Sequence, residues 1–526
     1  MKRAWAYQGL LLASLTVSGF AHADGDLAKV KHIIIVVLEN HSFDNYLGAL
    51  AYAPGSPYHG PARHGADDAA CRDDDHRCVD GLTCSVDRAG NLVCTNSNLD
   101  IDGGWVRAFH DTRRCVIPDL DHEWVASHRE ANFEHPNLTL LFSPNDGFVR
   151  QNDLLYQPDT GPETSTEDQT MAFYDQREIP FYYDLATHFA ISDRHFSSVL
   201  GPTFPNRAYL LAATSFGHVT SADELPPPGN YRPITGTIFD LLDSHHIDWA
   251  EYFQDVPYGG TFRVFSADAI DPHFMPLDVF LAQAAGAPDL PPLPAVAFID
   301  PAFGFFGREL ENDEHPPTDI QRGQAFVSQV VNAVRNGPSW KDSVIFITYD
   351  EHGGFYDHVR PPRANQSHAR TPDGIFPGQC ADLSDPPASL EPGGGAECST
   401  NFENPDDNSV ANAIALCPAL QRDPTGPFPV QCASFDQLGF RVPFIAVSPF
   451  SKPRYVSHTV GDHTSMLALI EKRFLRTGRG PKDVAHLTLR DANASTLEDM
   501  FDFDRSPSLS TPVTQAAPPA DDCTPQ

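Results

Sequence analysis

The sequence predicts an α/β protein in which helices cover a mostly parallel central sheet. Short apolar runs alternate along the chain with stretches of helical spacing, and one run, residues 32–38, is apolar at nearly every position. Such a run is typical of a parallel strand that is buried on both faces. Strands that alternate with helices predict a parallel sheet covered by those helices.

Further strands are expected at residues 295–299, 344–349 and 444–447. Helices are expected at residues 319–336 and 464–474, because apolar side chains recur there at helical spacing. In the first helix these are Phe326, Val327, Val330, Ala333 and Val334, and in the second they are Met466, Leu467, Leu469, Ile470 and Phe474. We expect these side chains in the core. Residues 504–526 are rich in Ser, Pro, Thr and Ala and predict a disordered tail.

The charge of the chain excludes some partners. The 526 residues include 70 acidic and 36 basic side chains, a formal net charge of −34. This field repels nucleic acid and anionic membranes, so we expect no nucleic-acid partner and at most transient contact with a membrane surface. Nothing in the sequence indicates an obligate protein partner.

The N-terminus predicts a signal peptide over residues 1–23. Lys2 and Arg3 precede a short apolar stretch, and residues 21–23 (Ala-His-Ala) fit a cleavage site. The alternative is an anchor helix, but the apolar stretch is short for a bilayer. We therefore expect a secreted or periplasmic protein.

The ten cysteines gather mainly in two stretches, which predict insertions at about residues 60–118 and 364–434. Disulfides are favoured in an exported protein. Zinc binding is the alternative, but no Cys-x-x-Cys pair occurs. The first stretch holds Cys71, Cys78, Cys84, Cys94 and Cys115, the second holds Cys380, Cys398, Cys417 and Cys432, and Cys523 lies near the end.

Two predicted strands run directly into acidic residues. Glu39 and Asn40 follow the first strand, and Asp350 and Glu351 follow the strand at 344–349. Carboxylates at one edge of a sheet repel one another unless a cation lies between them, and oxygen ligands suit a hard divalent ion. The alternative is that these side chains only cap the turns that follow.

A candidate nucleophile, Thr203, stands at the start of a predicted helix. It lies between Gly201-Pro202 and Pro205, which is also an ordinary helix start. The N–H groups of a helix start attract a phosphoryl group, and a metal-bound hydroxyl can act as a nucleophile. Asn206 and Arg207 would then bind the phosphate, or they only order the turn.

Three histidines add to this picture. His122 and His315 stand among acidic residues in predicted loops, and His463 opens the helix at 464–474. Histidines in loops are often solvated or structural, but a set around a phosphoryl group could bind oxyanion or protonate a leaving alkoxide.

Several motifs resemble those of one family. Residues 39–48 (Glu-Asn-His-Ser-Phe-Asp-Asn-Tyr-Leu-Gly) are similar to the E-N-R-S-F-D-x-x-x-G signature of the phosphoesterase family that contains bacterial phospholipases C and AcpA-type acid phosphatases. Residues 201–207 and 348–358 resemble its other two long blocks, and residues 441–443 and 462–465 resemble two short ones. The resemblance spans about residues 28–503.

The resemblance implies an alkaline-phosphatase-like, three-layer α/β/α sandwich, here with disulfide-rich insertions, over residues 24–503. It implies Thr203 as nucleophile and, with His122 and His315 in the phosphate pocket, one divalent ion (Ca²⁺, Mg²⁺, Mn²⁺ or Zn²⁺). His41 departs from the family, which usually has Arg there. The implied metal ligands are Glu39, Asn40, Asp350, Glu351 and Thr203.

The resemblance implies a secreted, metal-dependent phosphoesterase that acts on phospholipid or on a small phosphate ester. Phospholipase C action on the head-group phosphodiester is our first expectation, and acid phosphatase action on monoesters is the alternative. A sulfatase would need a C/S-x-P-x-R motif around its nucleophile, and no cysteine here has that context. An inactive secreted binding protein is the alternative from another class.

Overall fold

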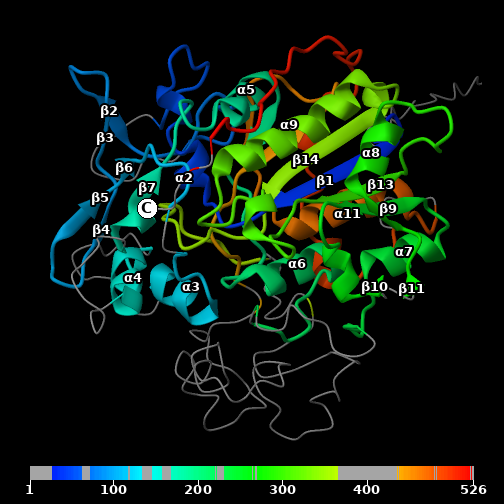
Figure 1. Ribbon diagram of the computed structural model, residues 1–526, viewed down its shortest axis with the longest axis horizontal. Helices are drawn as coiled ribbons and strands as arrows, with labels where there is room; N and C mark the ends of the chain where they lie inside the picture. Colours follow the sequence, from blue (N-terminus) through cyan, green and yellow to red (C-terminus); the bar gives the residue numbers. More distant parts are fainter. Residues whose placement is uncertain are drawn as a thin grey trace, which may run out of the picture.

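A single large sheet with helices on both faces forms the centre of the computed structural model (Figure 1). The structure describes residues 27–61, 71–116, 119–132, 145–156, 167–219, 221, 230–263, 265–266, 269–364, 373, 435, 437–478, 480, 483–521 and 523. Within these residues, the strands lie across the sheet in the order β12 (Phe274–Pro276), β9 (Trp249–Phe253), β13 (Val296–Asp300), β1 (His32–Leu38), β14 (Ser343–Tyr349), β15 (Phe444–Val447), β8 (Ala190–Ser192) and β16 (Tyr455–Ser457). β15 is antiparallel to both of its neighbours and all other neighbours are parallel, which confirms the predicted mostly parallel sheet.

The side chains of β1 divide between two cores, because successive residues of a strand point to opposite faces. Ile33, Ile35 and Val37 share one core with α6 (Thr203–Ala212), α7 (Ile238–Ser244) and α11 (His463–Phe474). Ile34, Val36 and Leu38 share the other with α5 (Pro180–His188), α8 (Leu277–Ala284) and α9 (Ile320–Asn336). The two helix layers lie on opposite sides of the sheet in Figure 1, which confirms the three-layer α/β/α architecture.

Side-chain caps set the start of both predicted helices. The carboxylate of Asp319 accepts the backbone N–H of Gln321 at the start of α9. Asp462 accepts the N–H of Thr464 and forms a capping box with Ser465 at the start of α11. Such caps satisfy N–H groups that have no partner within the helix. Both predicted helices are confirmed to within one residue at each end.

The first cysteine-rich stretch contains small two-stranded sheets. β2 (Cys84–Val86) pairs with β3 (Leu92–Cys94), β4 (Ser97–Leu99) with β5 (Trp105–Arg107), and β6 (Phe109–His110) with β7 (Ala172–Phe173). Disulfides Cys71–Cys78 and Cys84–Cys94 confirm the prediction for this stretch. The second stretch, with its four cysteines, lies outside the described residues, as does the predicted signal peptide. The remaining elements are α2 (Phe43–Leu47), α3 (Trp124–Ala131), α4 (Phe148–Tyr156), α12 (Leu489–Ala492), β10 (Phe265–Ser266) and β11 (Ala269–Ile270).

The C-terminal segment corrects one expectation. The sequence predicts a disordered tail over residues 504–526, but its described part lies along α9. Arg335 Nε donates to the carbonyl oxygen of Thr511 at 2.8 Å, and the N–H of Ala516 donates to Ser328 Oγ at 2.9 Å. A disulfide joins Cys523 to Cys115. Polar side chains of α9 therefore hold a segment whose composition alone suggests disorder.

No helix among the described residues is long and apolar enough to cross a membrane.

Candidate active site

Two neighbouring strands bring the predicted acidic residues to one edge of the sheet. β1 and β14 are parallel, with Leu38 opposite Tyr349, and the acids follow these two positions. The N–H of Asp350 donates to the carbonyl oxygen of Leu38 at 3.0 Å. The N–H of Asn40 donates to Asp350 Oδ1 at 3.3 Å. The register of the two strands therefore brings together Glu39, Asn40, Asp350 and Glu351.

Buried polar atoms at this edge lack hydrogen bonds. Within the described part of the chain, neither side-chain polar atom of Asn40 has a hydrogen-bond partner, and Glu351 Oε1 also has none. His122 Nε2 lies 3.9 Å from that Glu351 oxygen. A buried polar atom without a partner costs about 1–3 kcal/mol, so such an atom calls for an explanation. An amide oxygen and a carboxylate oxygen suit a hard divalent cation, and these residues therefore fit the expected metal.

The other oxygen of Glu351 is held in place. Oε2 accepts the N–H of Gly353 at 2.7 Å and lies 3.1 Å from His352 Nδ1. His352 Nε2 lies 2.7 Å from Glu130 Oε2 in α3. Burial alone would raise the pKa of Glu351, but His122 and His352 outweigh it and lower that pKa. Glu351 therefore stays ionised with a fixed orientation.

Two glycines allow the loops around these acids to pack closely. Gly353 has φ +62°, and a Cβ there would lie 2.2 Å from the carbonyl oxygen of Asn40. Gly354 has φ +71°, and its Cβ would lie 2.5 Å from Leu120 Cβ, next to the loop that carries His122. Only glycine adopts this backbone and leaves this space without strain.

Arg207 lies among the acids, on the helix that Thr203 begins. Its Nε donates to Asp350 Oδ2 and its Nη2 to Glu39 Oε1, both at 3.1 Å. Burial alone would lower the pKa of Arg207, but these carboxylates raise it. The guanidinium thus contacts carboxylates in this structure, and phosphate binding by Arg207 stays a prediction. Residues four apart share one face of a helix, so Thr203 lies on the face of α6 that carries Arg207.

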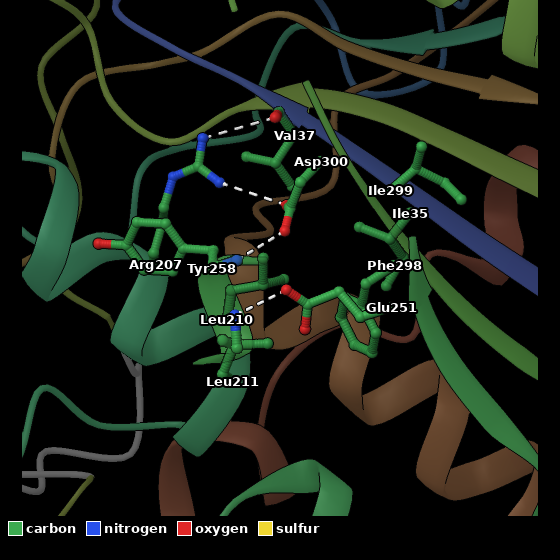
Figure 2. A pocket seen from close by; sticks show the side chains of 11 residues that line it. Ile35, Val37, Arg207, Leu210, Leu211, Glu251, Tyr258, Phe298, Ile299 and Asp300 are labelled. Carbon is green, nitrogen blue, oxygen red and sulfur yellow. Dashed lines mark hydrogen bonds and ion pairs between the residues drawn. The ribbon is translucent and has the colours of Figure 1, made fainter. Parts of the chain in front are cut away.

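Sequence reasoning missed a third acid, Asp300, at the end of β13. Its Oδ1 lies 3.9 Å from Arg207 Nη1, and its Oδ2 accepts the N–H of Tyr258 at 2.8 Å (Figure 2). The Tyr258 and Phe303 rings flank the guanidinium at 4.7 and 5.0 Å. The available signal was an acid directly after the strand expected at 295–299, the same pattern as in the other two strands.

A second carboxyl group that the sequence did not reveal lies behind Asp300. Glu251 points from β9 into a small cavity beneath Arg207, which Ile35, Val37 and Phe298 also line (Figure 2). Glu251 Oε1 accepts the N–H of Gly259 at 2.7 Å. Burial, and then the charge of Asp300, raise the pKa of Glu251 well above its usual value. Both effects favour the neutral form of Glu251.

Two predicted phosphate ligands, Asn206 and His463, have protein partners in this structure. Asn206 Oδ1 accepts the N–H of Val199 at 3.0 Å, and its Nδ2 donates to the carbonyl oxygen of Gly201 at 2.8 Å, so its amide closes the turn before α6. His463 Nε2 lies 3.0 Å from the carbonyl oxygen of Tyr349, and its Nδ1 lies 3.2 Å from Ser198 Oγ. Both ring nitrogens of His463 thus have protein partners, and phosphate binding by Asn206 and His463 stays a prediction.

His122 and His315 do come together, with ring centroids 6.1 Å apart. Each ring has Nδ1 close to a backbone carbonyl oxygen, that of Leu120 at 2.7 Å and that of Pro316 at 2.8 Å. These contacts leave Nε2 of each ring for other partners. Burial alone would lower the pKa of His122, but Glu351 and other nearby carboxylates raise it to about 10. Burial opposes protonation of His315 in the same way, and neighbouring carboxylates raise its pKa as well.

A buried cluster holds the His315 loop. Glu314 has φ +74°, and its carboxylate accepts three tyrosine hydroxyls, those of Tyr46 at 2.7 Å, Tyr182 at 2.5 Å and Tyr349 at 2.6 Å. His41, where the family usually has Arg, is fully buried here. It stacks on Tyr46 with ring centroids 4.1 Å apart, and its Nε2 lies 3.1 Å from the carbonyl oxygen of Glu314. The His41 ring therefore supports the residue that precedes His315.

A second charged cluster joins three of the motif blocks away from these acids. Arg441 Nε donates to Asp357 Oδ1 at 2.9 Å, and its Nη2 donates to Asp44 Oδ1 at 3.0 Å. His358 Nδ1 lies 2.6 Å from Asp44 Oδ2. Asp44, Asp357 and His358 have metal-ligand spacing, but the buried guanidinium of Arg441 already contacts both acids. We therefore assign this cluster a structural role.

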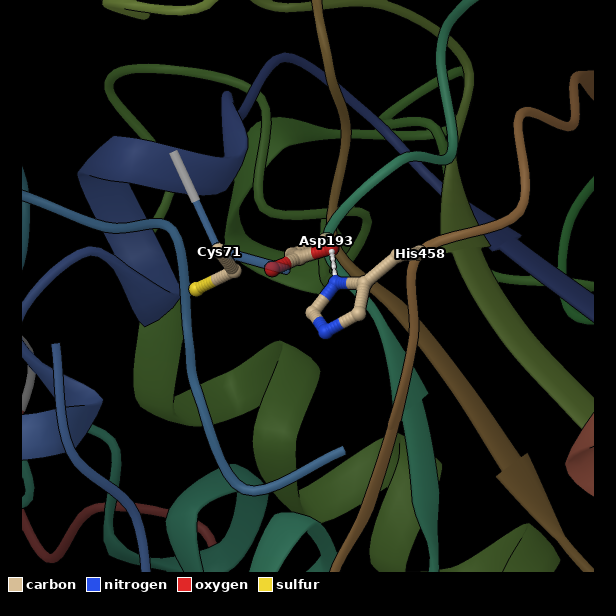
Figure 3. A group of neighbouring side chains, drawn as sticks. All are labelled: Cys71, Asp193 and His458. Carbon is tan, nitrogen blue, oxygen red and sulfur yellow. Dashed lines mark hydrogen bonds and ion pairs between the residues drawn. The ribbon is translucent and has the colours of Figure 1, made fainter. Parts of the chain in front are cut away.

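Another group with metal-ligand spacing contains Cys71, Asp193 and His458 (Figure 3). His458 Nδ1 lies 2.7 Å from Asp193 Oδ1, and the Cys71 side chain approaches from the cysteine-rich stretch. The Cys71 sulfur is bonded to Cys78, so it is not a thiolate ligand.

Comparison with known proteins identifies the family. The chain matches the Phosphoesterase family over residues 30–475, which confirms the resemblance seen in its motifs. Non-specific phospholipase C6 of Arabidopsis thaliana is 28% identical over 503 residues, which cover 93% of this chain and 75% of the relative. Phospholipase C B of Mycobacterium tuberculosis is 27% identical over 537 residues, which cover 96% of this chain and 85% of the relative.

Among solved structures, murine ectonucleotide pyrophosphatase/phosphodiesterase 5 is similar with a TM-score of 0.29 and 11% identity over 62% of this chain and 95% of that chain. A similarity this low supports no argument about the site. The family match, in contrast, covers most of the chain. This protein therefore belongs to the Phosphoesterase family and is a phosphoric ester hydrolase.

Proposed function

We propose that this protein is a phospholipase C that hydrolyses the head-group phosphodiester of phospholipids through Thr203. The relatives named phospholipase C support this substrate class. The observation that carries the proposal is a set of buried polar atoms without a hydrogen bond among the described residues: both side-chain polar atoms of Asn40, and Glu351 Oε1. One divalent cation would bind at this edge. Its proposed ligands are Glu39, Asn40, Asp350, Glu351 and Thr203.

Charge supports the need for that cation. The single positive charge of Arg207 faces three carboxylates, those of Glu39, Asp350 and Asp300. Like charges this close disfavour joint ionisation unless positive charge is added. A bound divalent ion supplies Lewis-acid activation of a hydroxyl and offsets charge on phosphoryl oxygens. Carboxylate and amide oxygens suit Ca²⁺, Mg²⁺ or Mn²⁺, and the nearby histidines also allow Zn²⁺.

Thr203 is the proposed nucleophile because of its position on α6. It opens the helix on the face that carries Arg207, and Arg207 binds the carboxylate of Asp350. The N–H groups of the first helical turn favour an anion at this end. Thr203 Oγ attacks phosphorus, the bond from phosphorus to the diacylglycerol oxygen breaks, and a phosphodiester on Thr203 results. Water then releases the phosphorylated head group and restores the hydroxyl.

The two histidines supply protons and positive charge. His122, whose pKa nearby carboxylates raise against the effect of burial, would offset charge on the equatorial oxygens. His315 is more exposed, at 25% of its side chain, against 11% for His122. We assign to His315 the proton that goes to the departing diacylglycerol oxygen, since that leaving group departs towards solvent and lipid.

Export to an oxidising compartment completes the proposal. The three disulfides of the described residues are the forms favoured outside the cytosol, and residues 1–23 carry the pattern of a signal peptide. N-terminal sequencing of exported protein should begin at Asp24. Recovery of the full-length chain from the cell interior, with reduced cysteines, would contradict export.

The first experiment compares two chromogenic substrates with purified protein. We expect chelator-sensitive release of p-nitrophenol from p-nitrophenylphosphorylcholine and little from p-nitrophenyl phosphate. Thr203→Ala should lose turnover by about 10³-fold or more, whereas Thr203→Ser keeps a hydroxyl and should retain part of it. Acid-quenched wild-type protein should carry phosphorylcholine on the peptide that contains Thr203.

Other outcomes of these experiments would contradict parts of the proposal. Cleavage of the monoester alone would contradict the phospholipase proposal and support an acid phosphatase. Substantial activity in Thr203→Ala would contradict the nucleophile assignment. Absence of turnover by metal-loaded protein on both substrates, and on phosphatidylcholine, would support the inactive binding protein.

A further inference from the structure

A loop beside the site exposes apolar side chains to solvent. Residues 301–310 follow β13 and lead to the segment that carries His315. In this loop Phe305 is 63% exposed, Phe306 is 67% exposed and Leu310 is 58% exposed. The two phenylalanines are the most exposed large hydrophobic side chains among the described residues. An apolar group of this kind next to a catalytic site often marks a surface that binds a partner or a membrane.

Hydrogen bonds hold the loop in this conformation. At its base, the N–H of Asn312 donates to the carbonyl oxygen of Ala302 at 3.0 Å, and the N–H of Ala302 donates to Asn312 Oδ1 at 2.7 Å. At its tip, the N–H of Phe305 donates to Asp255 Oδ2 at 3.0 Å. The exposure of the rings is therefore a consequence of how the backbone is held.

The same loop touches the acidic edge of the sheet. Phe303 lies over the guanidinium of Arg207, 5.0 Å from ring centroid to Cζ, and Arg207 binds Glu39 and Asp350. Phe305 is only two residues further along the chain. A surface that receives the two exposed rings is consequently presented to the site.

The charge of the loop is complementary to a zwitterionic lipid surface. Residues 301–307 (Pro-Ala-Phe-Gly-Phe-Phe-Gly) contain no charged side chain in a chain whose net charge is −34. Arg308 and Glu309 follow, so residues 301–310 have no formal net charge, and Arg308 is exposed. Aromatic rings favour the boundary between head groups and acyl chains, and a guanidinium pairs with lipid phosphate. The net charge of the chain disfavours an anionic surface.

We propose that residues 301–310 form an interfacial anchor, which seats the site on a zwitterionic phospholipid surface. An anchor of this kind implies that the substrate is phospholipid in a bilayer, and this part of the proposal rests on the proposed function. Binding to the surface does not depend on that function. Phe305 and Phe306 enter the head-group region and Arg308 contacts phosphate. Each ring that leaves water should strengthen binding on the order of tenfold.

The test uses the full protein, phosphatidylcholine vesicles and a double variant, Phe305→Ser with Phe306→Ser. The matched control is Leu489→Ser with Leu509→Ser, which changes residues that are 61% and 53% exposed elsewhere. We expect the Phe variant to lose about 100-fold in vesicle binding by co-sedimentation and a similar factor in vesicle hydrolysis. Its rate on soluble p-nitrophenylphosphorylcholine should stay within about twofold of the wild type, and the control should match the wild type throughout.

The proposal would be overturned by vesicle binding that the Phe variant leaves unchanged, or by an equal loss on the soluble substrate. It would also be overturned if the rings mediate a dimer that the Phe variant abolishes in sedimentation equilibrium, with no effect on vesicles. Thr203→Ala should bind vesicles like the wild type. Vesicle binding that needs the rings, without hydrolysis of any lipid by the wild type, would reject the proposed function and leave the anchor standing.

Discussion

Replacement of His358 by Gln should destabilise the protein in a way that depends on pH. His358 Nδ1 lies 2.6 Å from Asp44 Oδ2 and its Nε2 lies 3.3 Å from Asp80 Oδ1. Burial alone would lower the pKa of His358, but these two carboxylates raise it to about 10. Gln preserves a hydrogen-bond donor without the charge, so the substitution removes mainly the ionic part of the interaction.

The pKa of His358 determines the sign and size of the expected change in the free energy of unfolding. Because the folded-state pKa lies above the unfolded value of 6.5, the stabilisation is complete below about pH 6.5 and is lost as the pH rises to about 10. At about 1.4 kcal/mol per pH unit, this difference corresponds to at most about 5 kcal/mol. The side chain is 22% exposed, and solvent screens part of the interaction. We therefore expect Gln to lower the free energy of unfolding by about 2–3 kcal/mol at pH 6 and by less than about 1 kcal/mol near pH 10.

The assay is urea unfolding of the wild type and His358→Gln at several pH values, with disulfides intact. The control is His59→Gln, because His59 faces Asp75 at 3.4 Å with 55% and 40% of the two side chains exposed. An exposed pair contributes about 0–1 kcal/mol, so the control should show a small difference. A difference for His358→Gln that is constant across this pH range, or that grows with pH, would refute the reasoning.

Three further predictions concern the acidic edge. Arg207→Met should lower the free energy of unfolding in chelator by about 3–5 kcal/mol, because it leaves buried carboxylates uncompensated; a loss below about 1 kcal/mol by urea unfolding would contradict this. Asn40→Gly suits the backbone at φ 66° and should weaken divalent-ion binding in calorimetric titration, with stability within about 1 kcal/mol of the wild type; unchanged ion affinity would remove Asn40 from the ligand set. Glu251→Gln should change stability by less than about 1 kcal/mol at neutral pH, because burial and the charge of Asp300 raise the pKa of Glu251 and favour its neutral form, which Gln resembles; a large loss of thermal stability would contradict this expectation.

The sequence predicted strands well where an apolar run is continuous, but it could not predict their direction. Residues 32–38 and 444–447 are strands with the expected bounds. β15, the second of these, is antiparallel to both neighbours. Burial on both faces produces the same apolar pattern in either direction, so direction depends on the connection between strands. The long connection before β15 falls largely within the second cysteine-rich stretch, which offered no periodicity.

The site was predictable where its residues are local to a strand end. Glu39 and Asp350 were found because each directly follows an apolar run. Asp300 was missed because the predicted strand ended at residue 299, one residue before the observed end of β13. Asp300 also comes at the end of an apolar run, like Glu39 and Asp350. The position of Arg207 between these acids could not be derived, since it depends on how α6 packs across the sheet. A sequence pattern also cannot tell an acid neutralised by arginine from one that binds a metal.

The structure separates motif residues that support the fold from those that remain for chemistry. Asp44 and Arg441 belong to motif blocks, but their charged groups bind each other and are fully buried. Their presence would be expected in an active enzyme and in an inactive relative alike, because both need the fold. Asn40 and Glu351 differ, since no hydrogen bond among the described residues uses their remaining polar atoms. Buried polar atoms without hydrogen bonds lower stability, and the simplest explanation for their presence is that they bind a ligand. These two residues, rather than the motif matches, therefore argue against the inactive binding protein.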